Sequence, residues 1–247
     1  MKNSTLLFCL MVLTTGTLRS QSDYKQWETG YYRVKIGQAD MFEKGVAAHN
    51  KKYHTSDPYK VGVFNVHTGP NAGSYFMVMG PVTFTQLPGR PKGAEHDADW
   101  QKNVLPYVES IVDDGFWRQD QAYRYVPENA PPLNFYRVRN YTLLPGERDR
   151  LEDQFKKIKA VYDAKKYANG YDVYWRYGAS QGPHVTAELN FENWAYLDKE
   201  ISFDKDFDEV HGEGAYQRFL DEFALAIDRA KTYDEIMEFR ADLSSPW

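Results

Sequence analysis

Three residues in the second half of the chain have side chains suited to proton transfer and anion binding. Arg137 lies in the stretch FYRVRN (135–140), and His184 and Glu188 lie in HVTAELN (184–190). A histidine beside a carboxylate can move a proton, and an arginine can hold an anionic group. Arginine and glutamate also form ion pairs that have no catalytic role, and the sequence favours this structural interpretation.

The alternation of side chains along a strand predicts which way these residues point. Tyr136 and Val138 belong to the apolar face and should meet covering helices, so Arg137 should point the other way, into a barrel or sheet seam. The same rule places Glu188 and Arg240 on that inner side. These residues are therefore the first candidates for ligand binding.

A second set of candidates lies where helices should cover the sheet. His49 lies on an expected helix, His67 near the end of a strand and Trp117 near the start of another, while His96 falls in a polar loop over 88–99. A haem in such a cleft would need a histidine as axial ligand. The alternative is a set of surface or capping histidines, which the sequence favours because their spacing is not typical of metal ligands. We therefore predict no metal site and no obligate cofactor.

The elements that should position these residues occur twice. YYRVKI (31–36) resembles FYRVRN (135–140), and similar stretches follow both in the same order. The further pairs are ADMFEKGVAAHNKKY (39–53) with DQFKKIKAVYDAKKY (153–167), YKVGVFNV (59–66) with YDVYWRYG (171–178), and GSYFMVMGP (73–81) with GPHVTAELN (182–190). The order of the pairs indicates a duplication.

Apolar periodicity assigns these stretches to helices and strands. Helices are predicted over 39–53, 98–112, 153–167 and 214–230, and the intervening β-rich stretches are joined by hairpin signals at 68–73 and 179–182. Each half then has the order β-α-β-β-α-β. The predicted fold class is α+β: two tandem ferredoxin-like halves, 21–127 and 134–247, joined by a linker at 128–133. Their bare sheet faces would pack together as a pseudo-dimeric α+β barrel.

The stretch FYRVRNYTLLPGERDRLEDQF (135–155), a strand, a Pro-Gly turn and a helix, resembles the opening of NIPSNAP-like and antibiotic-biosynthesis-monooxygenase-like domains of the dimeric α+β barrel superfamily. The first half departs from that pattern, because Gly-Gln-Ala-Asp (37–40) replaces the Pro-Gly turn. The resemblance implies a single-chain barrel with a ligand cleft between helices and sheet. It also implies cofactor-independent oxygenation or, as in chlorite-dismutase-like proteins, haem chemistry.

The N-terminus has the layout of a secretory signal peptide over residues 1–20. A positive start at Lys2 is followed by the apolar run LLFCLMVL (6–13) and then by small polar residues. The run is too short to span a bilayer and contains Cys9, the one cysteine of the chain. We expect a secreted or periplasmic protein without a stable membrane anchor. The formal net charge of −5 argues against nucleic acid as a partner.

These observations predict an exported protein that binds a small aromatic or apolar ligand. Two alternatives stay open: a cofactor-independent monooxygenase or haem-dependent enzyme, and a purely structural or interaction module. Because both halves lie in one chain, a monomeric pseudo-dimer is expected.

Overall fold

The computed structural model describes residues 24–128, 134–178, 182–199 and 202–246. The predicted signal peptide and nearly all of the predicted linker lie outside the described residues. Within the described part of the chain, none of the helices has the length and apolar character needed to cross a membrane.

The chain first forms a strand, a helix, two strands, a helix and a strand, in the order β1 (Gln26–Val34), α1 (Ala39–Tyr53), β2 (Val61–Val66), β3 (Tyr75–Met79), α2 (Ala94–Asn103) and β4 (Val108–Gln119). The second part continues with β5 (Phe135–Tyr141), α3 (Arg148–Lys165), β6 (Tyr171–Tyr177), β7 (Val185–Phe191), α4 (Phe203–His211), α5 (Ala215–Ala226) and β8 (Tyr233–Phe239). Short 3₁₀ turns occur at Leu87–Gly89, Leu105–Tyr107, Trp194–Asp198 and Arg229–Lys231.

The strands form one closed antiparallel barrel in the order β1-β3-β2-β8-β5-β7-β6-β4. The prediction of two tandem ferredoxin-like halves packed sheet against sheet is therefore wrong. Strand edges pair across the boundary between the halves, at Phe64 with Phe239 and at Trp117 with Arg176. Such pairing satisfies the backbone N–H and C=O groups that two separate sheets would leave open at their edges. It also encloses a barrel interior in place of a seam between two sheets.

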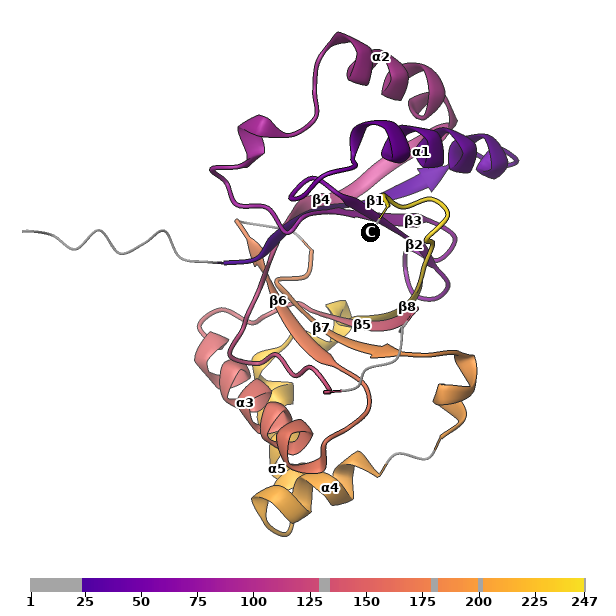
Figure 1. Ribbon diagram of the computed structural model, residues 1–247. Coiled ribbons are helices and arrows are strands. Elements are labelled where there is room, and N and C mark those ends of the chain that lie inside the picture. The colour runs from indigo at the N-terminus through magenta and orange to yellow at the C-terminus, as the bar shows by residue number, and fades with distance from the viewer. Residues whose placement is uncertain (1–23, 129–133, 179–181, 200–201, 247) are drawn as a thin grey trace, which may run out of the picture.

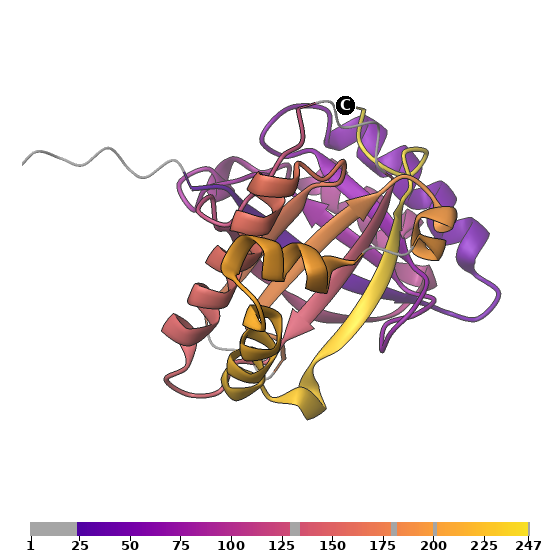
Figure 2. The ribbon, with the colours of Figure 1, turned by 90° about the horizontal axis from the view of Figure 1, so that it is seen from below.

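The helices lie outside the barrel in two groups, α1 and α2 on one side and α3, α4 and α5 on the other (Figure 1). The view from below shows the second group crossing the outside of the strands (Figure 2). Phe42 and Val46 of α1 are fully buried against Val63 of β2, and Leu151 and Phe155 of α3 are buried in the same way. Each buried side chain of this size contributes roughly 1.5–3 kcal/mol, so these contacts hold the helices against the barrel.

Helix α1 has the bounds predicted from its apolar spacing. Phe42, Val46 and His49 recur at intervals of four and three residues and are all buried. Gly45 lies on the same side, where a Cβ would stand 1.9 Å from the carbonyl oxygen of Asn103 at the end of α2. The missing side chain therefore allows α2 to approach α1 closely, and this approach positions the residues that α2 carries.

The helix predicted over 98–112 is wrong in its second half. Helix α2 ends at Asn103, and Val108 to Gln119 instead form β4, which pairs along β1 from Val34 to Gln26. The apolar residues Val108 and Ile111 fit a helical period, but the backbone hydrogen bonds of β4 complete the barrel on both of its sides. Long-range pairing thus overrides the local pattern.

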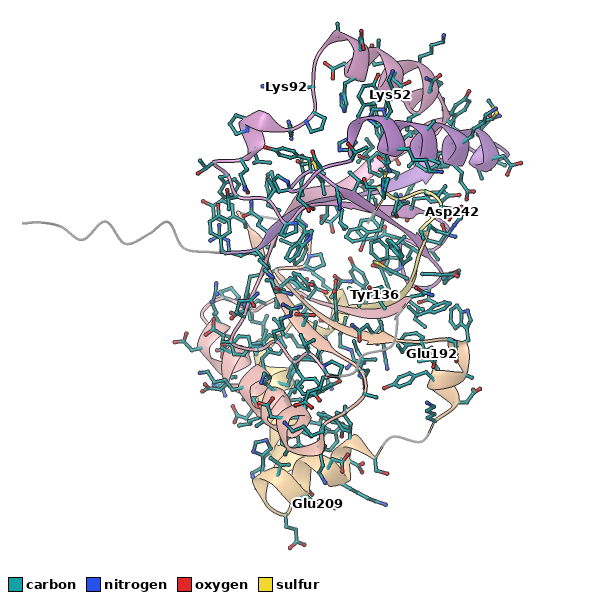
Figure 3. The ribbon with its side chains drawn as sticks, in the orientation of Figure 1. Lys52, Lys92, Tyr136, Glu192, Glu209 and Asp242 are labelled. Carbon is teal, nitrogen blue, oxygen red and sulfur yellow. The ribbon has the colours of Figure 1, made fainter. Side chains whose placement is uncertain are left out.

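The direction of the side chains in β5 is also opposite to the prediction. Val138 packs in the barrel interior with Tyr31 and Met237, and Tyr136 lies beside the interior as labelled in Figure 3. In β1, by contrast, Tyr32 faces the helices, where it contacts Phe42 as predicted. The two similar stretches are thus offset by one residue in the barrel, which exchanges inward and outward faces.

Candidate functional site

The barrel encloses a cavity of about 650 Å³. Its wall is largely aromatic, with contributions from strands of both halves: Trp27, Phe64, Phe76, Trp117, Tyr136 and Phe239. Ring faces and edges of this kind bury a planar or apolar molecule well. Trp117, predicted to line a cleft under the helices, lies in this interior cavity instead.

The cavity also contains a small number of polar groups. Thr29 and Thr186 are buried in its wall, and neither side-chain hydroxyl has a hydrogen-bond partner. A buried hydroxyl without a partner is costly, typically by 1–3 kcal/mol. A ligand that exchanges hydrogen bonds with either hydroxyl would recover part of that cost.

Glu188 is the cavity residue with the most unusual acid–base behaviour. Burial and, to a smaller extent, the neighbouring Asp172 carboxylate raise the pKa of its carboxyl to about 8, although a hydrogen bond from Tyr174 opposes the shift. Asp172 lies opposite Glu188 on β6, and burial raises its own pKa to about 6. At neutral pH Glu188 is therefore mostly protonated and able to donate a hydrogen bond, which gives the cavity one group that can exchange a proton.

One end of the barrel is filled by a hydrogen-bonded polar group. Glu235 is fully buried and accepts hydrogen bonds from the Tyr31 hydroxyl at 2.6 Å, from Asn71 at 3.0 Å and from Asn140 at 3.4 Å. Burial raises the pKa of Glu235, although these hydrogen bonds oppose the shift. These hydrogen bonds occupy both carboxyl oxygens of Glu235 and connect β8 to Tyr31 of β1 and to Asn71 in the β2–β3 loop.

The structure does not bring Arg137, His184 and Glu188 together. Arg137 lies on the outer face, where it donates to Asp234 at 2.6 and 3.0 Å, and Arg139 pairs with the same carboxylate. His184 accepts a hydrogen bond from the backbone N–H of Leu143 at 3.1 Å. Only Glu188 of the predicted cluster faces the cavity, because the one-residue offset of β5 turns its arginines outward.

Two further candidates also lie outside the barrel interior. Arg240 pairs with Glu43 of α1 and with Asp242, and so ties the C-terminal segment to that helix. His67 contacts Glu238 at 2.8 Å and packs edge-on against Trp194. Their contacts are those of residues that hold elements together.

His49 belongs to a cluster that the sequence analysis missed. His49 of α1, His54 just after α1 and His96 of α2 each offer a ring nitrogen, and the three nitrogens lie within 4.8 Å of one another. His49 is 1% exposed and His54 is 9% exposed. Burial lowers the pKa of His49 and lowers that of His54 to about 4, so both rings are neutral at neutral pH.

A second cavity, of about 570 Å³, adjoins this cluster between the helices and the sheet. The three histidines form part of its wall, together with Tyr32 and Trp100. Lys92, labelled beside α2 in Figure 3, also lines it. This is the helix–sheet cleft that the sequence predicted, and His49 lies in it as expected.

The residues of these cavities do not fit a haem. In the first cleft, nitrogens of three histidines lie together in one region. In a haem, the four porphyrin nitrogens surround the iron, so three histidine rings would occupy the space that the porphyrin needs. The corresponding cleft of the second half, about 420 Å³, has a tyrosine-rich wall, and no histidine, methionine or cysteine is among its described lining residues. Burial raises the pKa of Tyr141 to about 12 and also raises that of Tyr162, so the phenolate needed for iron ligation is disfavoured.

No family model matches the sequence. No curated protein matches it either. Solved structures do match in fold.

A proposed monooxygenase from Fusobacterium nucleatum has a TM-score of 0.57 at 7% identity, with coverage of 87% of this chain and 92% of that chain. An anthrone oxidase-like protein has a TM-score of 0.56 at 8% identity, with coverage of 89% and 92%. Chlorite dismutase from Candidatus Nitrospira defluvii has a TM-score of 0.52 at 8% identity, with coverage of 88% and 92%.

The chain therefore shares its overall fold with these three proteins. At such low identity these similarities establish the fold alone. The narrower resemblance to NIPSNAP-like domains and the origin of the chain by tandem duplication stay predictions.

His96 and Asp172 are two residues of these sites that the sequence does not single out. The polar composition of 88–99 predicts a loop at His96, whereas His96 lies in the first turn of α2. The sequence contains only a weak signal for the histidine cluster. His49 and His54 lie near the end of a predicted helix, but His96 follows them more than forty residues further along the chain. Asp172 carried no signal beyond its place in an alternating strand.

Proposed function

We propose that the barrel interior binds a small aromatic or apolar molecule that carries a hydrogen-bonding group. The observation that carries this proposal is the aromatic cavity of about 650 Å³ with two unpartnered hydroxyls, those of Thr29 and Thr186. Ligand sites are typically apolar cavities with a few fixed polar groups. Glu188 adds a proton donor that can contact a phenol or carbonyl oxygen.

A second candidate function is cofactor-independent oxygenation of an electron-rich aromatic molecule. The observation that favours it is the Glu188 carboxyl, whose pKa of about 8 suits it to accept a proton from a weakly acidic substrate at slightly alkaline pH. The similarity in fold to a proposed monooxygenase and an anthrone oxidase-like protein supports this reading. Haem is not part of the proposal, because the cavity residues do not fit it.

The proposal includes export and a monomeric state. Export is supported by the layout of residues 1–20, and a monomer by the closure of the barrel within one chain. N-terminal sequencing of the protein recovered from the medium or periplasm would test export, and light scattering would test the monomer.

Ligand binding is tested by titration with a fluorescent apolar probe, 1-anilinonaphthalene-8-sulfonate, together with mass spectrometry of extracts of the purified protein. Val138→Phe fills the interior and should weaken probe binding at least tenfold. Ile36→Phe is the matched control, because Ile36 is fully exposed. Equal probe affinity in the two variants would show that the probe binds elsewhere and would remove support for the interior site.

Oxygenation is tested by oxygen consumption with anthrone as substrate. We expect the rate to rise with pH through the range in which Glu188 ionises, and Glu188→Gln to abolish that rise. A rate that stays the same in Glu188→Gln would exclude Glu188 as the base. Absence of turnover with retained probe binding would leave binding as the function.

A further inference from the structure

We propose that His49, His54 and His96 bind one divalent transition-metal ion, with Zn²⁺ as the best match, and leave one coordination position open to the adjoining cleft. This site is separate from the barrel interior. It joins α1, the turn after it, and α2 on the outer side of the sheet.

The Nδ1 atom of each of the three rings lies within hydrogen-bond distance of an oxygen atom. His49 Nδ1 lies 2.7 Å from Asp99 Oδ2, His54 Nδ1 lies 2.8 Å from the carbonyl oxygen of Tyr59, and His96 Nδ1 lies 2.8 Å from Asp97 Oδ1. A carbonyl or carboxylate oxygen can only accept a hydrogen bond. Each ring therefore donates from Nδ1.

These hydrogen bonds fix the tautomer of each ring. A neutral imidazole that carries its proton on Nδ1 has a lone pair on Nε2. All three rings are therefore set up with Nε2 as the free donor atom for a metal. Metal-binding histidines commonly have this arrangement, with the second nitrogen held by a carboxylate or a backbone carbonyl.

The Nε2 atom of His96 is buried and has no hydrogen-bond partner. The ring centroids of the three histidines are 4.7, 5.4 and 5.6 Å apart, and each ring offers a nitrogen within 4.8 Å of those of the other two. Lone pairs that face one another repel, and a cation between them converts this repulsion into attraction.

The remaining histidines behave differently. His67 contacts Glu238, His184 accepts from a backbone N–H, and the Nε2 of His211 lies 3.0 Å from the carbonyl oxygen of Lys157. Among the residues that the structure describes, none of these three belongs to a group of possible metal ligands, whereas His49, His54 and His96 do.

The donor set and its dimensions favour zinc. Three neutral imidazoles suit Zn²⁺ and neighbouring late transition metals, whereas Mg²⁺ and Ca²⁺ prefer oxygen ligands. Tetrahedral Zn²⁺ with bonds of about 2.1 Å separates its nitrogens by about 3.4 Å. Rings whose nitrogens already lie within 4.8 Å need only small rotations to reach that spacing.

The cleft of about 570 Å³ supplies the open position. It is bordered by all three histidines and by Tyr32 and Trp100. Three protein ligands with a fourth position left for water or a small molecule are typical of catalytic zinc, while structural zinc has four protein ligands. We infer that the fourth position faces this cleft and takes water or a small anionic ligand.

The first experiment uses the tag-free full chain after treatment with a chelator. Titration with Co²⁺ should give one ion per chain and the strong visible absorption of a tetrahedral site, and Zn²⁺ should displace it. Addition of azide should change the Co²⁺ spectrum if the fourth position is open. An unchanged spectrum would overturn the open position, and the absence of stoichiometric binding would overturn the site.

Variants separate the site from adventitious binding. His96→Gln removes a ligand at the rim, where the side chain is 18% exposed, and should weaken Co²⁺ binding at least a hundredfold. Asp99→Asn alters the group that accepts the hydrogen bond from His49 and should weaken Co²⁺ binding about tenfold. His211→Gln is the matched control and should bind as the unchanged protein does. Far-UV circular dichroism checks that each variant is folded, and equal affinity in folded His96→Gln and His211→Gln would refute the assignment.

Discussion

Glu188 and Asp172 lie directly opposite each other on β7 and β6, so their side chains project from the same face of the barrel wall. Burial raises both pKa values, to about 8 for Glu188 and about 6 for Asp172. Two acids in such proximity do not ionise together at low cost, so the pair loses its protons in sequence. The barrel interior therefore contains a proton source whose charge depends on pH in the physiological range.

This pair predicts that stability falls as pH rises. Glu188 has a reference pKa of 4.5 and a folded pKa of about 8, so between these values the folded chain binds a proton that the unfolded chain does not. The free energy of unfolding therefore decreases through this window. Glu188→Gln should flatten that decrease and raise the stability at pH 8.5 by on the order of 2 kcal/mol.

Urea unfolding at pH 5 and pH 8.5 measures this effect. Glu192→Gln provides the control, because Glu192 is exposed, as labelled in Figure 3. The same pH slope in the Glu188 variant and the unchanged protein would contradict the assignment of Glu188.

The unpartnered hydroxyl of Thr186 predicts a stabilising substitution. Thr186→Val keeps the shape of the side chain and removes a buried oxygen that has no partner, so thermal unfolding should show a gain of about 1 kcal/mol. Thr142→Val is the control with the opposite sign, because the Thr142 hydroxyl donates to the carbonyl of Lys231. If the Thr186 hydroxyl forms a hydrogen bond with the ligand, Thr186→Val should also bind the natural ligand more weakly. A loss of stability in Thr186→Val would contradict the prediction, because it would show that the hydroxyl already has a hydrogen-bond partner.

The close approach of α2 to α1 predicts that Gly45 cannot be replaced. Gly→Ala within a helix ordinarily stabilises by about 0.5–1 kcal/mol. Here the new Cβ would meet the Asn103 carbonyl oxygen, so Gly45→Ala should instead destabilise by about 2 kcal/mol or more. Ala48→Gly, at an exposed position of the same helix, should cost about 1 kcal/mol by propensity alone. Chemical denaturation gives the free energy of unfolding of both variants. A stabilised Gly45→Ala would show that α2 does not approach α1 closely at this position.

The outward position of Arg137 predicts a weak effect on ligand binding. Arg137→Gln removes one of the two arginines that contact Asp234, an exposed pair whose loss should cost less than about 1 kcal/mol and less still at high salt. Probe affinity in the barrel should change less than twofold, as measured by the same fluorescence titration. A large loss of affinity would place Arg137 at the ligand after all.

Local structure followed directly from the sequence. The apolar spacing of Phe42, Val46 and Tyr53 predicted a helix over 39–53, which are the bounds of α1, and the hairpin signal at 68–73 predicted the antiparallel pairing of β2 with β3. The direction of Tyr32 toward the helices was also predicted. These features depend on residues close together in the chain, whose periodicity reports one helix face or one strand face.

The tertiary structure alone decided the closure of the barrel, the face taken by each side chain of β5, and the grouping of the histidines. A strand of this barrel has one face toward the covering helices and the other toward an apolar cavity, so either face can be apolar. The alternation of side chains in β5 therefore does not decide whether Tyr136 or Arg137 points inward. Closure depends on pairing between β2 and β8 and between β4 and β6, which are far apart in sequence. His96 meets His49 across two helices whose close approach at Gly45 requires the absence of a side chain, a contact that no local pattern encodes.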